Sequence, residues 1–71
     1  MSNARQAIAA AQQVGAERTA ASEMAEAQQL LKLAQEELDQ GDYSDARQNA
    51  IRARNAAEKA LRITQGSPTP P

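Results

Sequence analysis

Alanine is the feature of this sequence that most restricts how the chain can fold. Apolar residues make up 41% of the 71 residues and 17 of them are alanines, whereas Phe, Trp and Cys are absent and Tyr occurs once. An alanine methyl buries little apolar surface, so a core built from it needs elements that approach each other closely. Alanine also has the highest helix propensity of any residue. The composition therefore predicts a small all-α domain with a thin core.

The spacing of apolar residues predicts three helices, over about residues 4–14, 21–40 and 44–64. In each of them apolar residues recur every three or four positions, which places them on one face. The face of the second helix carries Leu31 and Leu38, whereas the face of the third is almost entirely alanine. We therefore expect an antiparallel αα-hairpin of the second and third helices, with the short first helix as a third member. The alanines of the third helix are Ala46, Ala50, Ala53, Ala57 and Ala60.

Two glycines mark the ends of the first two predicted helices. Gly15 and Gly41 follow the last apolar residue of each pattern, where a glycine adopts the left-handed capping conformation at little cost. After Gly41, either Asp42 or Ser44 is expected to cap the third helix, and Tyr43 is expected to lie across the open end of the hairpin. The sequence thus predicts structural turns at Gly15 and at Gly41-Asp42-Tyr43.

The domain is expected to span residues 1–65, followed by a disordered, proline-rich tail over 66–71. No stretch approaches the ~20 apolar residues that a membrane-spanning helix needs. Residues 1–4 are either a native start or, because Ser-Asn-Ala is a common cloning remnant, an addition to the natural chain.

The composition argues against an enzyme. The chain has no histidine and no cysteine. Histidine is the commonest general base, and both residues are among the commonest metal ligands. The carboxylates fall at helix ends with no apolar cluster near them to exclude water. We therefore predict no catalytic residue, no metal and no cofactor.

Nucleic acid is also an improbable partner. The net charge is −1 with one aromatic residue, whereas nucleic-acid-binding proteins usually combine a basic surface with aromatic side chains. The cations of residues 46–65 fall into two rows on the predicted third helix, Arg47 and Arg54 in one and Arg52 and Lys59 in the other. A solvated basic face beside the acidic second helix explains them.

The turn Gly41-Asp42-Tyr43-Ser44-Asp45-Ala46, followed by Ala50 and Ala53, resembles the second half of a tetratricopeptide repeat. The resemblance implies a tetratricopeptide-like three-helix unit that binds a peptide segment. The chain departs from that family because it holds one unit instead of an array, lacks the aromatic residues of the first repeat helix, and has no proline near Ile63.

Residues 4–61 as a whole resemble a bacterial domain family of unknown function. The similarity includes Gly15-Ala16, then Leu31, Ala34 and Leu38 at spacings of three and four, and the run from Gly41 to Arg47. Members are similar to small secreted lipoproteins or to modules that precede OmpA-like domains. The resemblance implies a periplasmic or outer-membrane-associated location, with a lipid anchor upstream, whereas a native start at Met1 would favour the cytoplasm.

Three large apolar residues, Leu33, Ile51 and Ile63, fall away from the predicted packing faces. Either the first helix covers part of this set, or they are incidentally exposed, or they face a protein partner. Because the core is thin, a homodimer would supply additional burial. The leading hypothesis is a non-enzymatic helical interaction or scaffold module of the bacterial cell envelope, and the alternative is a small cytosolic tetratricopeptide-like adaptor.

Overall fold

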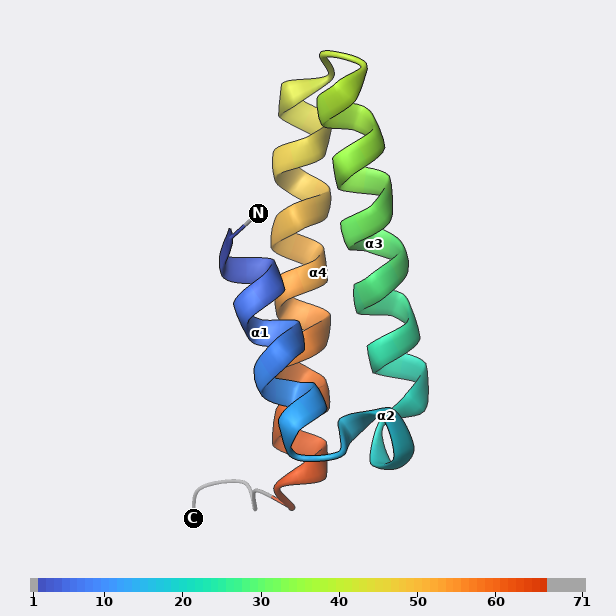
Figure 1. The fold of residues 1–71 in the computed structure, drawn as a ribbon, viewed down its shortest axis with the longest axis vertical. Coiled ribbons are helices and arrows are strands. Elements are labelled where there is room, and N and C mark those ends of the chain that lie inside the picture. Colours follow the sequence, from blue (N-terminus) through green and yellow to red (C-terminus); the bar gives the residue numbers. More distant parts are fainter. Residues whose placement is uncertain (1, 67–71) are drawn as a thin grey trace.

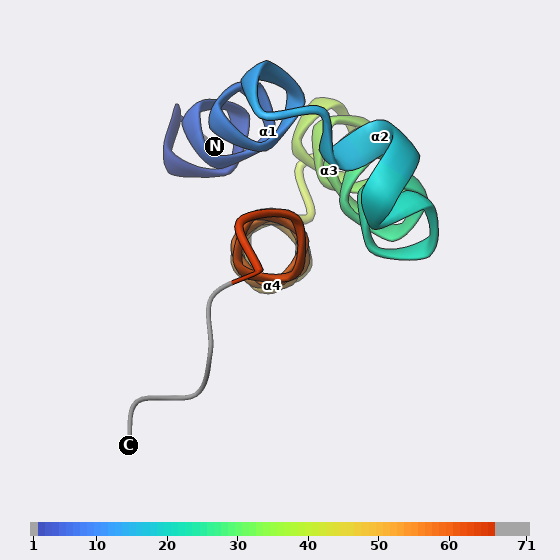
Figure 2. The ribbon, with the colours of Figure 1, turned by 90° about the horizontal axis from the view of Figure 1, so that it is seen from below.

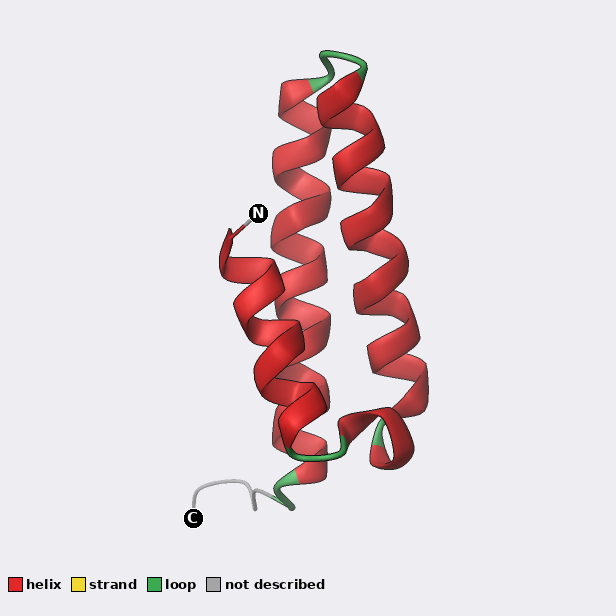
Figure 3. Cartoon of the chain, viewed as in Figure 1, coloured by secondary structure: helices red, strands yellow, loops and turns green. Residues whose placement is uncertain are grey.

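A computed structural model describes residues 2–66, which form four helices and no strand (Figures 1 and 3). These are α1 (Ser2–Gln13), α2 (Ala16–Thr19), α3 (Ala21–Asp39) and α4 (Tyr43–Thr64). The all-helical prediction is confirmed. Of the predicted tail, residues 67–71 lie outside the described residues.

The single-turn helix α2 was not predicted. It begins after Gly15, whose φ of 79° is in the left-handed region, and it ends at Thr19, with Ala20 between it and α3. The backbone N–H of Ala20 donates to the carbonyl oxygen of Ala16 at 2.8 Å and closes this turn, and the hydroxyl of Thr19 also donates to the carbonyl oxygen of Gly15 at 3.4 Å. A four-residue segment is too short for apolar periodicity to reveal it, so the pattern of spacing gave no signal here.

The helices pack around α4. In Figure 1 the chain runs up α3 and down α4, and these two helices lie side by side. Helix α1 lies beside the lower part of α4, and the view from below shows α1 and α3 both against α4 (Figure 2). The resulting molecule is elongated, with extents of 42 × 24 × 17 Å.

The core consists almost entirely of alanine. Among residues 2–66, every buried side chain except Ile8 and Met24 is an alanine. Met24 is 2% exposed and belongs to a cluster of buried residues that come from all four helices. The close approach of α3 and α4 follows from the alanine face of α4, because small side chains leave little space between the two backbones. The alanines buried on α4 are Ala46, Ala50, Ala53, Ala56, Ala57 and Ala60.

The turn between α3 and α4 closes through backbone hydrogen bonds. Gly41, with φ of 86°, donates to the carbonyl oxygen of Leu38 at 3.1 Å, and Asp42 donates to that of Glu37 at 2.8 Å. This pair of bonds is the Schellman motif, which satisfies the last carbonyl groups of a helix. Asp42 occupies the N-cap position of α4, but its side chain makes no capping hydrogen bond.

Two large residues near this turn are more exposed than the sequence suggested. Leu38 was placed on the packing face of its helix, yet it is 44% exposed, and the ring of Tyr43, expected to lie across the open end, is 65% exposed. The reason is the length of α1, which is too short to reach the turn from the other end of α4 (Figure 1). The two side chains therefore border an uncovered part of the α3–α4 pair.

Candidate functional site

The uncovered part of the α3–α4 pair contains a groove of about 570 Å³. At 1.5 Å per residue, the 12 residues of α1 are about 18 Å long and the 22 residues of α4 about 33 Å. Helix α1 therefore covers about half of α4. The groove begins beside the N-terminal end of α1, at Asn3 and Ala4. We refer to this hollow as the turn-side groove.

Helix α4 provides most of the lining. Tyr43, Arg47, Ile51 and Arg54 follow one another at spacings of four, four and three residues, so they form one row along the helix. Next to this row lie Ala46 and Ala50. Both alanines are buried by their surroundings, and their small side chains leave the space that forms the hollow.

Helix α3 contributes Leu38 on the other side of the groove. Leu38 and Ile51 are each 44% exposed, so both offer apolar surface to a binding partner. Further burial of a large aliphatic side chain is favourable by roughly 25 cal/mol for each Å² removed from water. The groove thus combines an alanine floor with half-exposed apolar edges.

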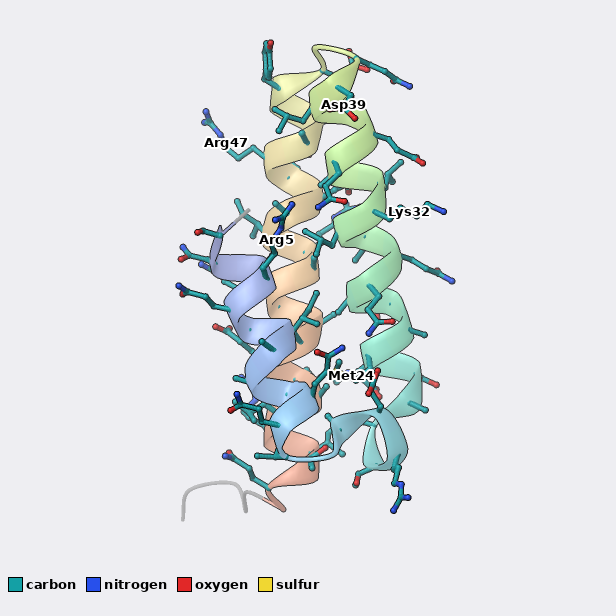
Figure 4. All side chains as sticks on the ribbon, in the orientation of Figure 1. Arg5, Met24, Lys32, Asp39 and Arg47 are labelled. Carbon is teal, nitrogen blue, oxygen red and sulfur yellow. The ribbon has the colours of Figure 1, made fainter. Side chains whose placement is uncertain are left out.

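The charge of the groove is positive. Its lining includes two arginines, Arg47 and Arg54, and no carboxylate. Arg47 extends away from the bundle beside the turn-side half of α4, and Arg5 extends from α1 toward that half in the same view (Figure 4). The groove is therefore electropositive although the chain as a whole has a net charge of −1.

Arg54 is the more constrained of the two arginines. It is half-buried, its Nε is buried without a hydrogen-bond acceptor among residues 2–66, and one Nη donates to the side chain of Asn55 at 3.5 Å. A buried donor without an acceptor costs on the order of 1–3 kcal/mol. Arg54 therefore has unused capacity to donate hydrogen bonds.

A second, smaller hollow of about 390 Å³ lies elsewhere between α3 and α4. Its lining includes Arg52, which follows Arg47 by five residues and so lies about 140° around α4 from it. This hollow has mixed charge, because its lining includes Glu26 as well as Arg52 and Lys59, and its lining also includes Leu30. Above it, Asn49 donates to a carboxylate oxygen of Glu37 at 2.7 Å and links α4 to α3.

The three residues predicted to face a partner do not form a single patch. Ile51 lines the turn-side groove, whereas Leu33 and Ile63, each 42% exposed, do not. By helical spacing, Leu33 shares a face of α3 with Leu30, and Ile63 shares a face of α4 with Ala56, so both belong to the side of the second hollow. The turn residues predicted at Gly15, Gly41, Asp42 and Tyr43 lie at helix ends.

Sequence reasoning did not identify most of the turn-side groove. It treated Leu38 as core, Arg47 and Arg54 as solvated cations, and Ala46 and Ala50 as part of a uniform seam. The available signal was the difference in length between the predicted first and third helices, over 4–14 and 44–64. A short helix packed on a long one must leave part of the long one uncovered.

The structure gives no support for a metal or a membrane span within residues 2–66. No group of three or more carboxylate side chains in this region is placed to hold a metal ion. None of its helices combines the length and the apolarity needed to cross a bilayer, which agrees with the sequence prediction.

A family model described as a domain of unknown function, DUF4398, matches residues 1–66. No curated protein and no solved structure matches the chain. The match spans the region in which the sequence resembles a small domain family of unknown function, and it confirms that part of the resemblance. The chain therefore belongs to the DUF4398 family.

Proposed function

We propose that this domain is a non-enzymatic helical interaction or scaffold module of the bacterial cell envelope. The observation that carries the proposal is the turn-side groove, in which Leu38, Tyr43 and Ile51 offer apolar surface beside an alanine floor. A contiguous apolar surface bordered by polar side chains is typical of a protein-binding site.

The lining supports binding over catalysis. Its polar side chains are those of Asn3, Tyr43, Arg47 and Arg54. None of these is a carboxylate, an imidazole or a thiol, which are the usual general bases and nucleophiles. The arginines suit recognition of an acidic group instead, because the guanidinium stays protonated and donates several hydrogen bonds.

The envelope location follows from the resemblance of residues 4–61 to small secreted lipoproteins and to modules that precede OmpA-like domains. On this proposal the domain is periplasmic or outer-membrane-associated, held there by a lipid anchor or a neighbouring domain outside residues 1–71. Its elongated shape of 42 × 24 × 17 Å suits a spacer or scaffold element.

A second candidate is a cytosolic tetratricopeptide-like adaptor. The observation that favours it is the α3–α4 pair, with a glycine-aromatic turn at Gly41–Tyr43 and an alanine face on α4, accompanied by a third helix. This candidate predicts that the same groove binds a peptide segment of a cytosolic protein. The two candidates differ in the compartment in which the partner is found.

We also propose that the domain forms a symmetric homodimer through the side that contains the second hollow. Asn49 of α4 bonds to Glu37 of α3, so Leu33 is about level with residue 53 of α4. Ile63 therefore lies about ten residues, or about 15 Å, further from the turn than Leu33 on the same side. In a two-fold arrangement Leu33 of one copy would pack against Ile63 of the other, and this contact would occur twice. Such a dimer leaves the turn-side groove free.

Photocross-linking in the bacterium that encodes the protein tests the function. A photoreactive residue replaces Ile51 in the groove or, as a control, Val14, which is 42% exposed at the far end of α1. The proposal expects an adduct with another envelope protein from position 51 only, in the membrane or periplasmic fraction. An adduct confined to the cytosolic fraction would favour the adaptor, and equal labelling from both positions would contradict a specific site.

A further inference from the structure

We propose that the turn-side groove binds an acidic amphipathic helix of a partner protein, about three turns long and lying in line with α1. The inference rests on the proposed function and names the chemistry of the partner. It follows from the charge of the groove, from the way α1 packs on the same surface, and from the spacing of the two arginines.

Charge selects an acidic occupant. Arg47 and Arg54 are the charged residues of the lining, so an occupant with carboxylates would meet complementary charge and one with lysines would be repelled. Arg54 adds a specific reason, because its buried Nε has no acceptor among the described residues. If the side chain of Arg54 rotates, a carboxylate of the partner that approaches its Nε and one Nη side-on would supply the acceptor.

The packing of α1 shows which kind of segment this surface accepts. Helix α1 buries Ala4, Ile8 and Ala11, at spacings of four and three residues, in the half of the domain opposite the turn. The buried alanines of α4 continue without interruption from that half into the floor of the groove. A second helix with the same apolar spacing therefore matches the uncovered half of the surface.

The length of the groove and the positions of its arginines define the occupant further. From Tyr43 to Arg54 the row spans 11 residues, about 17 Å or three helical turns. Arg47 and Arg54 are seven residues apart, about 10.5 Å along the axis. The occupant should therefore place two carboxylates seven residues apart beside its apolar stripe, in either chain direction.

A second copy of this chain does not supply such a helix. The acidic residues of α3 are Glu23, Glu26, Glu36, Glu37 and Asp39, and those of α4 are Asp45 and Glu58. No two acidic residues within one of these helices are seven positions apart, and α1 has none. A second copy of residues 1–71 is thus not the expected occupant.

Binding of designed peptides to the full 71-residue chain tests the inference. The probe is a peptide of about 14 residues with leucines at spacings of four and three and two glutamates seven residues apart beside them. A matched peptide has lysines in place of the glutamates, and a third has the acidic composition in scrambled order. Tyr43 is the sole aromatic residue and lines the groove, so its fluorescence reports binding without a label.

The inference expects the acidic amphipathic peptide to bind more tightly than either control, by up to about 25-fold, since each of two charge pairs contributes up to about fivefold. The double variant Arg47→Glu, Arg54→Glu should reverse the preference and bind the lysine peptide, which also shows that the variant is folded. The variant Arg18→Glu, Arg62→Glu makes the same charge change at exposed positions outside the groove and should leave the preference unchanged.

Equal binding of the scrambled peptide would reduce the effect to general charge attraction and overturn the inference. Absence of binding by the acidic peptide would also overturn it, and so would a self-associated chain whose dimer is lost on Ile51→Ser. These failures are separable from that of the proposed function. A specific adduct from position 51 in cells, together with no preference for acidic peptides, would retain the interaction module and reject this partner.

Discussion

The turn at Gly41 yields a prediction whose magnitude follows directly from the structure. Gly41 has φ of 86°, and a Cβ added there meets no atom within 4 Å. The cost of Gly41→Ala is therefore due to the backbone alone, since an L-residue in the left-handed region is disfavoured by about 1–2 kcal/mol. An alanine also restricts the unfolded chain and thereby returns about 0.4–1 kcal/mol. The net destabilisation should be about 1 kcal/mol.

D-alanine at the same position separates the two contributions. It restricts the unfolded chain as L-alanine does, but it favours positive φ, so the D form should be more stable than the L form by about 1–2 kcal/mol. For a domain of this size the difference corresponds to about 4–16 °C in melting temperature. Chemical synthesis provides both chains, and far-UV circular dichroism with urea or heat measures their free energies of unfolding.

Equal stability of the two forms would refute the reasoning, because residue 41 would then not have a positive φ. The α3–α4 turn described above would have to be different, and α4 would not be positioned beside Leu38. Replacement of Gly41 by valine should cost at least as much as L-alanine, since a β-branched residue resists this conformation further.

Three other changes test the core and the assembly. Met24→Ala should lower the free energy of unfolding by about 2–5 kcal/mol, because Met24 is the largest fully buried side chain among residues 2–66. Leu33→Ala, at a half-exposed site, should cost under about 1 kcal/mol, and urea unfolding compares the two variants. Ala53→Leu should destabilise by about 1–3 kcal/mol, because Ala53 is fully buried and a larger side chain would separate the helices; a gain in stability would show that the seam is loosely packed. Sedimentation equilibrium should give a mass above 7.6 kDa that falls toward it on dilution, and a constant 7.6 kDa mass would exclude the homodimer.

Much of the fold could be predicted from the sequence because helix formation here depends on local patterns. The alanines of α4 recur at spacings of three and four, and glycines follow the apolar patterns of α1 and α3 at Gly15 and Gly41. Both kinds of signal are read within a few residues of chain. Helix α2 was not predicted because a single helical turn is too short to show a repeat of apolar residues.

The groove was missed because it depends on how far one helix extends along another. Periodicity showed that Leu38 lies on an apolar face of α3, but not that α1 ends before reaching it. Periodicity also showed that Arg47 and Arg54 lie on one side of α4. It did not show that the N-terminal end of α1 and the turn-side end of α3 border this side and shape the groove. The exposure of a residue on a packing face is set by tertiary contacts, which a single-helix pattern does not contain.

The turn-side groove exists because α1 extends only partway along α4 and leaves the turn-side half of α4 open. Because the chain has no cysteine, Asn3→Cys provides a single attachment site for a nitroxide at the edge of the groove. Paramagnetic broadening of backbone amide signals then maps the surroundings of residue 3. We expect the strongest broadening on α4 at residues 46–54 and weaker broadening at residues 60–64. The strongest broadening at residues 60–64, or in α2, would contradict this arrangement, because α1 would then run in the opposite direction along α4. The strongest broadening at residues 40–43 would also contradict it, because α1 would then extend over the groove.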